Sequence, residues 1–182
     1  MIILRKGDIT TSNSDVIVNA ANKRLLAGSG VCGAIFDAAG YDKLQDECNK
    51  LAPIKTGEAV ITNGYNLIAK YIIHTAGPMY MGRPDEPKLL KDSYLNSLLL
   101  ASKYNLKSIS FPSISTGIYG YPIEDAAKIA LNTAKEFEKD NPNSSIKEII
   151  FYLYDDLTYQ IFLNEYNKVF KWTREIWFIF IN

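Results

Sequence analysis

The sequence predicts an α/β fold, a three-layer α/β/α sandwich with a mixed, mainly parallel sheet. Short apolar runs typical of strands alternate along the chain with longer segments of helical spacing. Val16, Ile17 and Val18 follow one another without a polar residue, as expected for a strand that is covered on both faces. With 182 residues, of which 47% are hydrophobic, the chain is long enough for one domain with a substantial core and too short for two.

The first half of the chain is expected to hold four strands and one helix. Residues from Val31 onward follow helical spacing, and Gly40 is expected to end that helix as its C-cap. The turn residues between the apolar runs separate the strands from one another. The four strands are expected within residues 1–6, 14–22, 57–65 and 70–77.

The second half is expected to alternate between helix and strand. A helical face runs through residues 86–104, and a strand within 107–113 ends at Pro112. Pro122 is expected in the first turn of a helix that reaches about Asp140, because a helix tolerates proline there. A last strand within 147–154 and an amphipathic helix over 156–170 complete the predicted order.

In a parallel sheet, ligands bind at the carboxyl ends of the strands, which here fall near Asn19, Phe111 and Tyr152. The first of these loops carries glycines at 28, 30 and 33 and leads into a helix. It fits three interpretations: a phosphate cradle at a helix N-terminus, a tight turn with no ligand, or a nucleophile site around Cys32. Nine residues separate Asn19 from Ser29 and no Gly-Lys-Ser/Thr is present, so the loop is neither a dinucleotide fingerprint nor a P-loop.

The second loop, residues 112–122, is also rich in glycine and hydroxyl groups, and it is longer than an ordinary strand-to-helix connection. Its backbone N–H groups could bind a second face of the phosphates that the first loop would hold. Two such loops on corresponding strand ends indicate a pyrophosphate held between them. The candidate ligand-binding residues of this loop are Ser115, Thr116, Gly117, Ile118 and Tyr119.

Two further positions have a functional and a structural interpretation. Asp8, at the end of the first strand, could accept a hydrogen bond from an exocyclic amine, or it could cap a turn. Tyr154, after the last strand, could stack on a base, or it could belong to the core.

Composition limits the partners and the compartment. Twenty basic residues balance twenty acidic ones, so no nucleic-acid or membrane partner is expected. Two cysteines without a C-x-x-C pair and a single histidine do not suffice for the usual zinc sites, and they are typical of reduced thiols in the cytosol. With no signal peptide or membrane-spanning run in this sequence, a cytoplasmic protein is expected.

The stretches "GDIT", "DVIVNAAN", "GSGVCGAIFDAAG", "YIIHTAGP" and "SISTGIYGYP" together resemble the macro domain family, in its MacroD-type ADP-ribosyl hydrolase branch. The resemblance covers about residues 1–168 and implies a macro domain over 1–170, followed by a tail, 171–182, of unassigned role. That tail could be an added edge strand, a dimer contact or an accident of the reading frame. The family fold implies ADP-ribose bound in a surface cleft, with no cofactor and no metal.

The resemblance also implies roles for individual residues. Asp8 would bind the adenine amine, Ile9 would contact the ring through its backbone amide, and Tyr154 would lie against it. Asn22 would hold the distal ribose, and Asn19 would only support the strand end. His74 matches a family position inside a strand and is expected to be a hydrogen-bonded core histidine, or one that supports the site from behind without touching the ligand. The first phosphate loop would comprise Gly30, Val31 and Cys32; the second, Ser115, Gly117, Ile118 and Tyr119, with Tyr119 also packing on the distal ribose.

One substitution within the resemblance bears on mechanism. The branch commonly reads Gly-Val-Asp-Gly-Ala-Ile-His, whereas this chain has Cys32 for the acidic residue and Phe36 for the histidine. The family's acidic residue is thought to orient the attacking water. Cys32 could act as a nucleophile, but it would need a neighbouring base; as a small polarizable residue it could instead simply fill the loop.

The implied activity is hydrolysis of ADP-ribosyl esters, either on Asp or Glu of proteins or in O-acetyl-ADP-ribose, with Asn22, Cys32 and Tyr119 as the catalytic candidates. In this interpretation the substrate's own phosphate holds the water over the anomeric carbon. A reader that binds ADP-ribose without cleaving it is the alternative. A phosphatase acting on ADP-ribose phosphate is a third, for which the sequence offers no nucleophile or metal site.

Overall fold

The structure of the protein is a computed structural model that describes the backbone of residues 1–179 and the side chains of residues 1–170. Of the predicted tail, residues 171–179 continue the last helix by their backbone, and residues 180–182 lie outside the described part.

Six strands form one sheet in the order β1-β6-β5-β2-β4-β3. All neighbouring strands are parallel except β3, which runs antiparallel to β4 at one edge. The predicted mixed, mainly parallel sheet is therefore confirmed, and each strand lies within its predicted range. The strands are β1 (Ile2–Lys6), β2 (Val16–Ala20), β3 (Ala59–Asn63), β4 (Tyr71–Thr75), β5 (Ser108–Phe111) and β6 (Glu148–Leu153).

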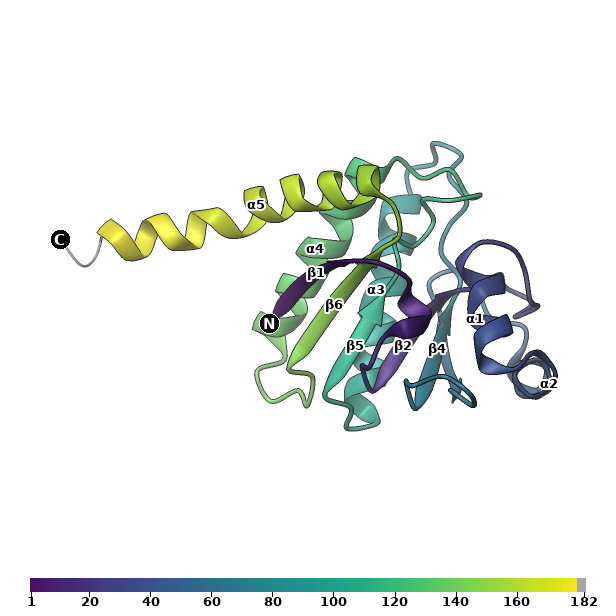
Figure 1. The fold of residues 1–182 in the computed structure, drawn as a ribbon. Coiled ribbons are helices and arrows are strands. Elements are labelled where there is room, and N and C mark those ends of the chain that lie inside the picture. The colour runs from purple at the N-terminus through teal and green to yellow at the C-terminus, as the bar shows by residue number, and fades with distance from the viewer. Residues whose placement is uncertain (180–182) are drawn as a thin grey trace.

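Helices cover both faces of this sheet (Figure 1). On β2 the side chains alternate: Val16 and Val18 pack with α3, α4 and α5, whereas Ile17 packs with α1 and α2. All three are buried, which confirms that this strand is covered on both sides. The helices are α1 (Val31–Ala39), α2 (Tyr41–Leu51), α3 (Glu86–Lys103), α4 (Ile123–Asp140) and α5 (Asp156–Ile179), with a 3₁₀ turn, η1 (Ile9–Thr11).

Helix α2 is missing from the sequence prediction. Gly40 does end α1, with φ of +100°, as expected, but the same residue then begins α2. Only Leu44 and Cys48 of α2 are buried, four positions apart, so its apolar stripe is too narrow to stand out in a polar segment. Pro122 directly precedes α4 rather than lying in its first turn.

The core under α3, α4 and α5 centres on an aromatic cluster. The rings of Phe111 and Phe151 are stacked with centroids 5.7 Å apart, and Tyr94 and Phe162 flank them at 5.3 and 5.8 Å. The Tyr94 hydroxyl reaches beyond this cluster to accept a hydrogen bond from the backbone N–H of Ile114, 3.0 Å away. The central core is therefore bonded directly to the loop that follows β5.

Replacing Phe151 with Ala should lower the free energy of unfolding by about 3–5 kcal/mol, because the change removes a fully buried ring from this cluster. Urea unfolding measures the loss. The matched control is Tyr154→Ala, which removes an aromatic ring that is 82% exposed. This change should alter the free energy of unfolding by less than about 0.5 kcal/mol. Equal losses in the two variants would contradict this account of the core.

Candidate functional site

A continuous cleft lies across the carboxyl ends of β2, β5 and β6, where the sequence predicted ligand-binding loops. It consists of two hollows of about 300 and 440 Å³. Gly30, Val31, Ser113 and Gly117 line both hollows and therefore join them into one cleft. The smaller hollow lies beside Asn22, Cys32 and Tyr119, and the larger one beside Asp8, Ile9 and Tyr154.

The structure thus brings the predicted site residues together along one cleft. Every candidate lines at least one of the two hollows: Asp8, Ile9, Asn22, Gly30, Val31, Cys32, Ser115, Thr116, Gly117, Ile118, Tyr119 and Tyr154.

The loop after β2, residues 21–30, is organised by side-chain hydrogen bonds to its own backbone. The Asn22 amide donates to the Leu26 carbonyl at 2.6 Å, and its carbonyl oxygen accepts from the N–H groups of Arg24 and Leu26. From α2, Gln45 accepts from Ala27 N–H and donates to the Leu25 carbonyl. The helix that the sequence analysis missed therefore supports the loop that carries Asn22.

Two glycines, one at the end of this loop and one in the first turn of α1, are required by the geometry. Gly30, just before α1 begins, has φ of +62°, a backbone conformation that residues other than glycine rarely adopt. A Cβ on Gly33 would lie 2.6 Å from the Gly28 carbonyl oxygen, so the first turn of α1 packs directly against the loop. The loop closes onto the N-terminus of α1, where backbone N–H groups have no partner within the helix.

The loop after β5, residues 112–122, is held at both ends. Tyr121 N–H donates to the Ser115 carbonyl, and Tyr80 N–H donates to the Tyr119 carbonyl, each at 2.9 Å. A Cβ on Gly77 would lie 2.3 Å from Ser115 Oγ, so the segment that follows β4 also packs tightly against this loop. The loop conformation is set by neighbouring backbone before any ligand arrives.

Two buried hydroxyls of this loop have no hydrogen-bond partner among the described residues. They belong to Ser113 and Ser115, and both residues line the cleft. Buried polar groups are nearly always paired, so unpaired hydroxyls at a cleft point to a polar ligand. Ser113 was not among the predicted site residues, although its place at the end of β5 could have indicated it.

At the other end of the cleft, Asp8 caps a turn. Its Oδ1 accepts hydrogen bonds from the N–H and the hydroxyl of Thr10, at 2.9 and 2.8 Å, while the residue also lines the larger hollow. The two interpretations of Asp8 are therefore compatible. The interpretation of Tyr154 as a core residue is wrong, because the side chain is 82% exposed beside the hollow.

Cys32 lies at the start of α1 with its thiol turned inward. Its Sγ accepts from the Asn19 amide at 3.6 Å and lies 3.8 Å from the Leu26 carbonyl, to which it donates. The Leu26 carbonyl oxygen therefore accepts hydrogen bonds from both the Cys32 thiol and the Asn22 amide. Burial raises the pKa of the Cys32 thiol, so it is protonated at neutral pH and is a poor nucleophile.

His74 is the only histidine of the chain and is fully buried in β4, opposite Asn19 in the sheet register. Asn19 lies between the imidazole and Cys32: its amide nitrogen is 3.1 Å from His74 Nδ1, and Thr62 Oγ1 is 2.9 Å from Nε2. Burial lowers the pKa of His74 to about 3 and keeps the ring neutral. As expected, His74 is a satisfied core residue, and it does not contact the thiol of Cys32 directly.

No carboxylate or imidazole side chain is among the described residues that line the smaller hollow. Across the described part of the chain, no group of three or more His, Cys, Asp or Glu side chains gathers as metal ligands would. None of the described helices has the length and apolar character needed to cross a membrane.

Comparisons with known proteins agree on one family. The family model described as "Macro domain" matches residues 18–130. ADP-ribose glycohydrolase MACROD2 of Xenopus laevis is 47% identical over 167 residues, which cover 91% of this chain but only 40% of that protein.

Solved structures match over most of the chain. The Oceanobacillus iheyensis macrodomain with ADP superimposes with a TM-score of 0.87 at 41% identity, covering 92% of this chain and 90% of the other. The Trypanosoma brucei macrodomain in complex with ADP-ribose gives a TM-score of 0.82 at 39% identity, covering 88% and 67%. These neighbours are similar in fold and in sequence.

The neutral, buried state of His74 makes stability depend on pH. The unfolded chain binds a proton at the imidazole below about pH 6.5 and the folded chain does not, so stability is full above that pH and falls as the solution is acidified. Between pH 7 and pH 5 the free energy of unfolding should drop by about 2 kcal/mol. Urea unfolding at several pH values measures this drop, and His74→Gln should remove most of it. A parent protein with flat stability across this range would contradict the assignment.

Proposed function

Because the chain belongs to the macro domain family, we propose that it binds ADP-ribose in this cleft and hydrolyses the ester that joins ADP-ribose to a carboxylate. The substrate would be a protein mono-ADP-ribosylated on Asp or Glu, or O-acetyl-ADP-ribose. The observation that carries the proposal is the pair of preformed loops on adjacent strands, with the unpaired hydroxyls of Ser113 and Ser115 buried at the cleft.

The two hollows fit the two halves of ADP-ribose. Adenine would lie in the larger one, with Tyr154 against its face and Asp8 and Ile9 at its edge. The diphosphate would lie between the two loops, on the N–H groups of residues 30–32 and 115–119. The distal ribose would then occupy the smaller hollow beside Asn22 and Tyr119. The solved macrodomain complexes with ADP and ADP-ribose support this assignment by analogy.

In the proposed reaction on a substrate esterified at the anomeric carbon of the distal ribose, a water held by a substrate phosphate attacks that carbon. The bond between that carbon and the acyl oxygen breaks, and the carboxylate departs with the electron pair. The proton of the water passes to the phosphate oxygen and then to solvent. Asn22 and the second loop would orient the sugar, so catalysis comes mainly from positioning and from electrostatic stabilisation.

A reader that holds ADP-ribose without cleaving it is the second candidate. It is favoured by the lack of a carboxylate or imidazole among the described residues that line the smaller hollow. General-base assistance typically raises the rate of catalysis by about 10²–10⁴-fold, so a hydrolase that lacks it is slower but still active. Turnover of a labelled substrate therefore distinguishes the two candidates.

We further propose that residues 1–170 make up the functional domain and that the protein works in the cytoplasm. Every residue of the cleft lies within that range, and the family model lies inside it. Both cysteines are free thiols, as is usual in a reducing compartment.

The first test incubates the domain with a protein that carries labelled ADP-ribose on Glu or Asp. The parent chain should release the label, and Asn22→Asp should release it at least about 10²-fold more slowly. This variant keeps the acceptor that binds Arg24 and Leu26 N–H, but it places a carboxylate oxygen against the Leu26 carbonyl, to which the amide donated. Calorimetry of ADP-ribose binding by the same variant checks that the loop is intact. A parent chain that binds ADP-ribose in calorimetry yet releases no label would be a reader.

The second test concerns the thiol. Cys32→Asp should raise the rate constant kcat by about tenfold or more, because it restores a carboxylate beside the distal ribose. Cys32→Ala should keep kcat within about tenfold of the parent, because the thiol is protonated and is not a nucleophile. Cys32→Ser is the control for the contact with Leu26 O. Loss of all turnover in Cys32→Ala, with ADP-ribose affinity intact, would assign the thiol a chemical role.

A further inference from the structure

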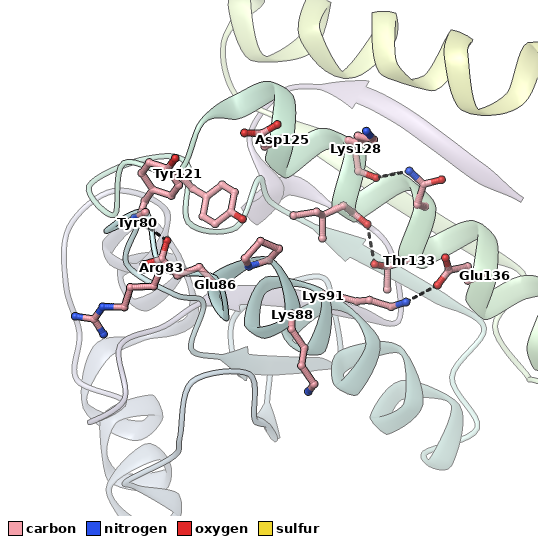
Figure 2. A pocket seen from close by; sticks show the side chains of 14 residues that line it. Tyr80, Arg83, Glu86, Lys88, Lys91, Tyr121, Asp125, Lys128, Thr133 and Glu136 are labelled. Atoms are coloured by element: carbon pink, nitrogen blue, oxygen red, sulfur yellow. Dashed lines mark hydrogen bonds and ion pairs between the residues drawn. The ribbon is translucent and has the colours of Figure 1, made fainter.

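A third hollow, of about 660 Å³, lies between α3 and α4, outside the cleft (Figure 2). Tyr80 and Tyr121 close one end of it, and the ion pair of Lys91 with Glu136 closes the other. None of the residues that line this interhelical hollow lines the ADP-ribose cleft. The proposed reaction therefore leaves it without a role.

The interhelical hollow and the cleft share one wall. Tyr80 donates its N–H to the carbonyl of Tyr119, which lines the cleft, and Tyr121 donates its N–H to Ser115. The rings of Tyr80 and Tyr121 meet edge to face, with centroids 5.1 Å apart. The interhelical hollow thus begins just behind the loop that encloses the proposed place of the distal ribose.

The shared wall is rigid because of a buried carboxylate. Glu86 is only 3% exposed, and its two oxygens accept hydrogen bonds from the backbone N–H groups of Met81 and Gly82, at 2.8 and 3.1 Å. This negative charge is fully engaged in holding the segment. The surface is therefore present before a partner binds, which lowers the entropy cost of docking.

Apolar side chains stand exposed on this wall. Met79, Tyr80 and Met81 follow one another and are all exposed, and Ile118, next to Tyr119, is 80% exposed. Single exposed apolar residues are ordinary, but a group gathered beside a ligand cleft is typical of an interaction surface. Pro87 and Ile129 also line the interhelical hollow and continue this apolar character into it.

The charges at the interhelical hollow favour an acidic partner. Arg83 and Lys128 make no ion pair among the described residues, whereas Lys91 is paired with Glu136. Figure 2 shows Arg83 directed outward from the hollow. Of the carboxylates that line it, Glu86 and Glu136 are engaged and Asp125 makes no ion pair. Lys88 also lines the hollow and is paired with Asp92. The lining therefore carries four basic side chains against three carboxylates, and Arg83 and Lys128 are the cations that make no ion pair among the described residues.

We propose that the interhelical hollow and the ridge formed by residues 79–81 and Ile118 dock the polypeptide that carries the ADP-ribose, and that they select an acidic segment. This inference rests on the proposed function, which places the ester at the end of the cleft beside Tyr119. A chain attached there leaves the cleft at the ridge. Each extended residue spans about 3.5 Å, so a short segment reaches the interhelical hollow. Carboxylates neighbouring the modified one would then meet Arg83 and Lys128.

The test compares two esters of the distal ribose, of which only one carries a polypeptide. One is a protein mono-ADP-ribosylated on Glu, and the other is O-acetyl-ADP-ribose. The double variant Arg83→Glu, Lys128→Glu should lower kcat/KM for the protein by about tenfold, mainly through KM. Turnover of O-acetyl-ADP-ribose and the affinity for ADP-ribose should not change. Met81→Ser should act in the same direction on the protein substrate alone.

The matched control is Lys43→Glu, Lys50→Glu, which makes the same change in charge on α2, on the opposite face of the sheet. It should leave both substrates unaffected. Equal loss on both substrates in the Arg83 and Lys128 variant, or no loss on either, would overturn the inference. If the parent hydrolyses neither substrate, the proposed reaction fails, and the inference is decided by calorimetry. An ADP-ribosylated acidic peptide that binds no tighter than free ADP-ribose would then overturn it.

Discussion

The parallel pairing of β2 with β5 is the constraint on which the site depends. Val16 lies opposite Ile109 and Ile17 opposite Ser110, so both strands end at the same edge of the sheet. The loops that follow must therefore leave side by side. Each then turns back into a helix, α1 or α4, and the cleft is the space between them. Neither loop could form this cleft alone, because each supplies one wall.

The loops keep their shape because the core is bonded to them. Tyr94, buried in the aromatic cluster, accepts a hydrogen bond from Ile114 N–H, while Gly77 lets the segment after β4 approach Ser115. Gln45 of α2 holds the first loop in the same way, through hydrogen bonds to the backbone of Leu25 and Ala27. A site formed in this way is preorganised, so binding energy is not spent on ordering the loops.

The sequence was sufficient for the sheet and for the two glycine-rich loops, because strand periodicity and glycine-rich loops are local signals. Other cleft residues, such as Ile9 and Asn22, were indicated only by the resemblance to the macro domain family. It could not indicate α2, whose two buried residues leave almost no pattern, and it therefore missed Gln45. It also missed Ser113, Gly77 and Tyr94, whose importance lies in contacts between distant segments. The pairing of Asn19 with His74 depends on the register of β2 and β4, which composition does not encode.

The same network explains why a thiol is compatible with this position. The Asn19 amide nitrogen lies within hydrogen-bond distance of both Cys32 Sγ and His74 Nδ1. The Cys32 thiol in turn donates to the Leu26 carbonyl, which also accepts a hydrogen bond from the Asn22 amide. A neutral chain of weak hydrogen bonds thus connects β4 to the loop that would hold the sugar. A carboxylate at position 32 would add charge and a possible base, but the loop does not need it to keep its shape. In the proposed reaction, positioning and acid–base chemistry would therefore be separable: the described residues that line the smaller hollow include Asn22 to orient the sugar but no carboxylate or imidazole to act as a base.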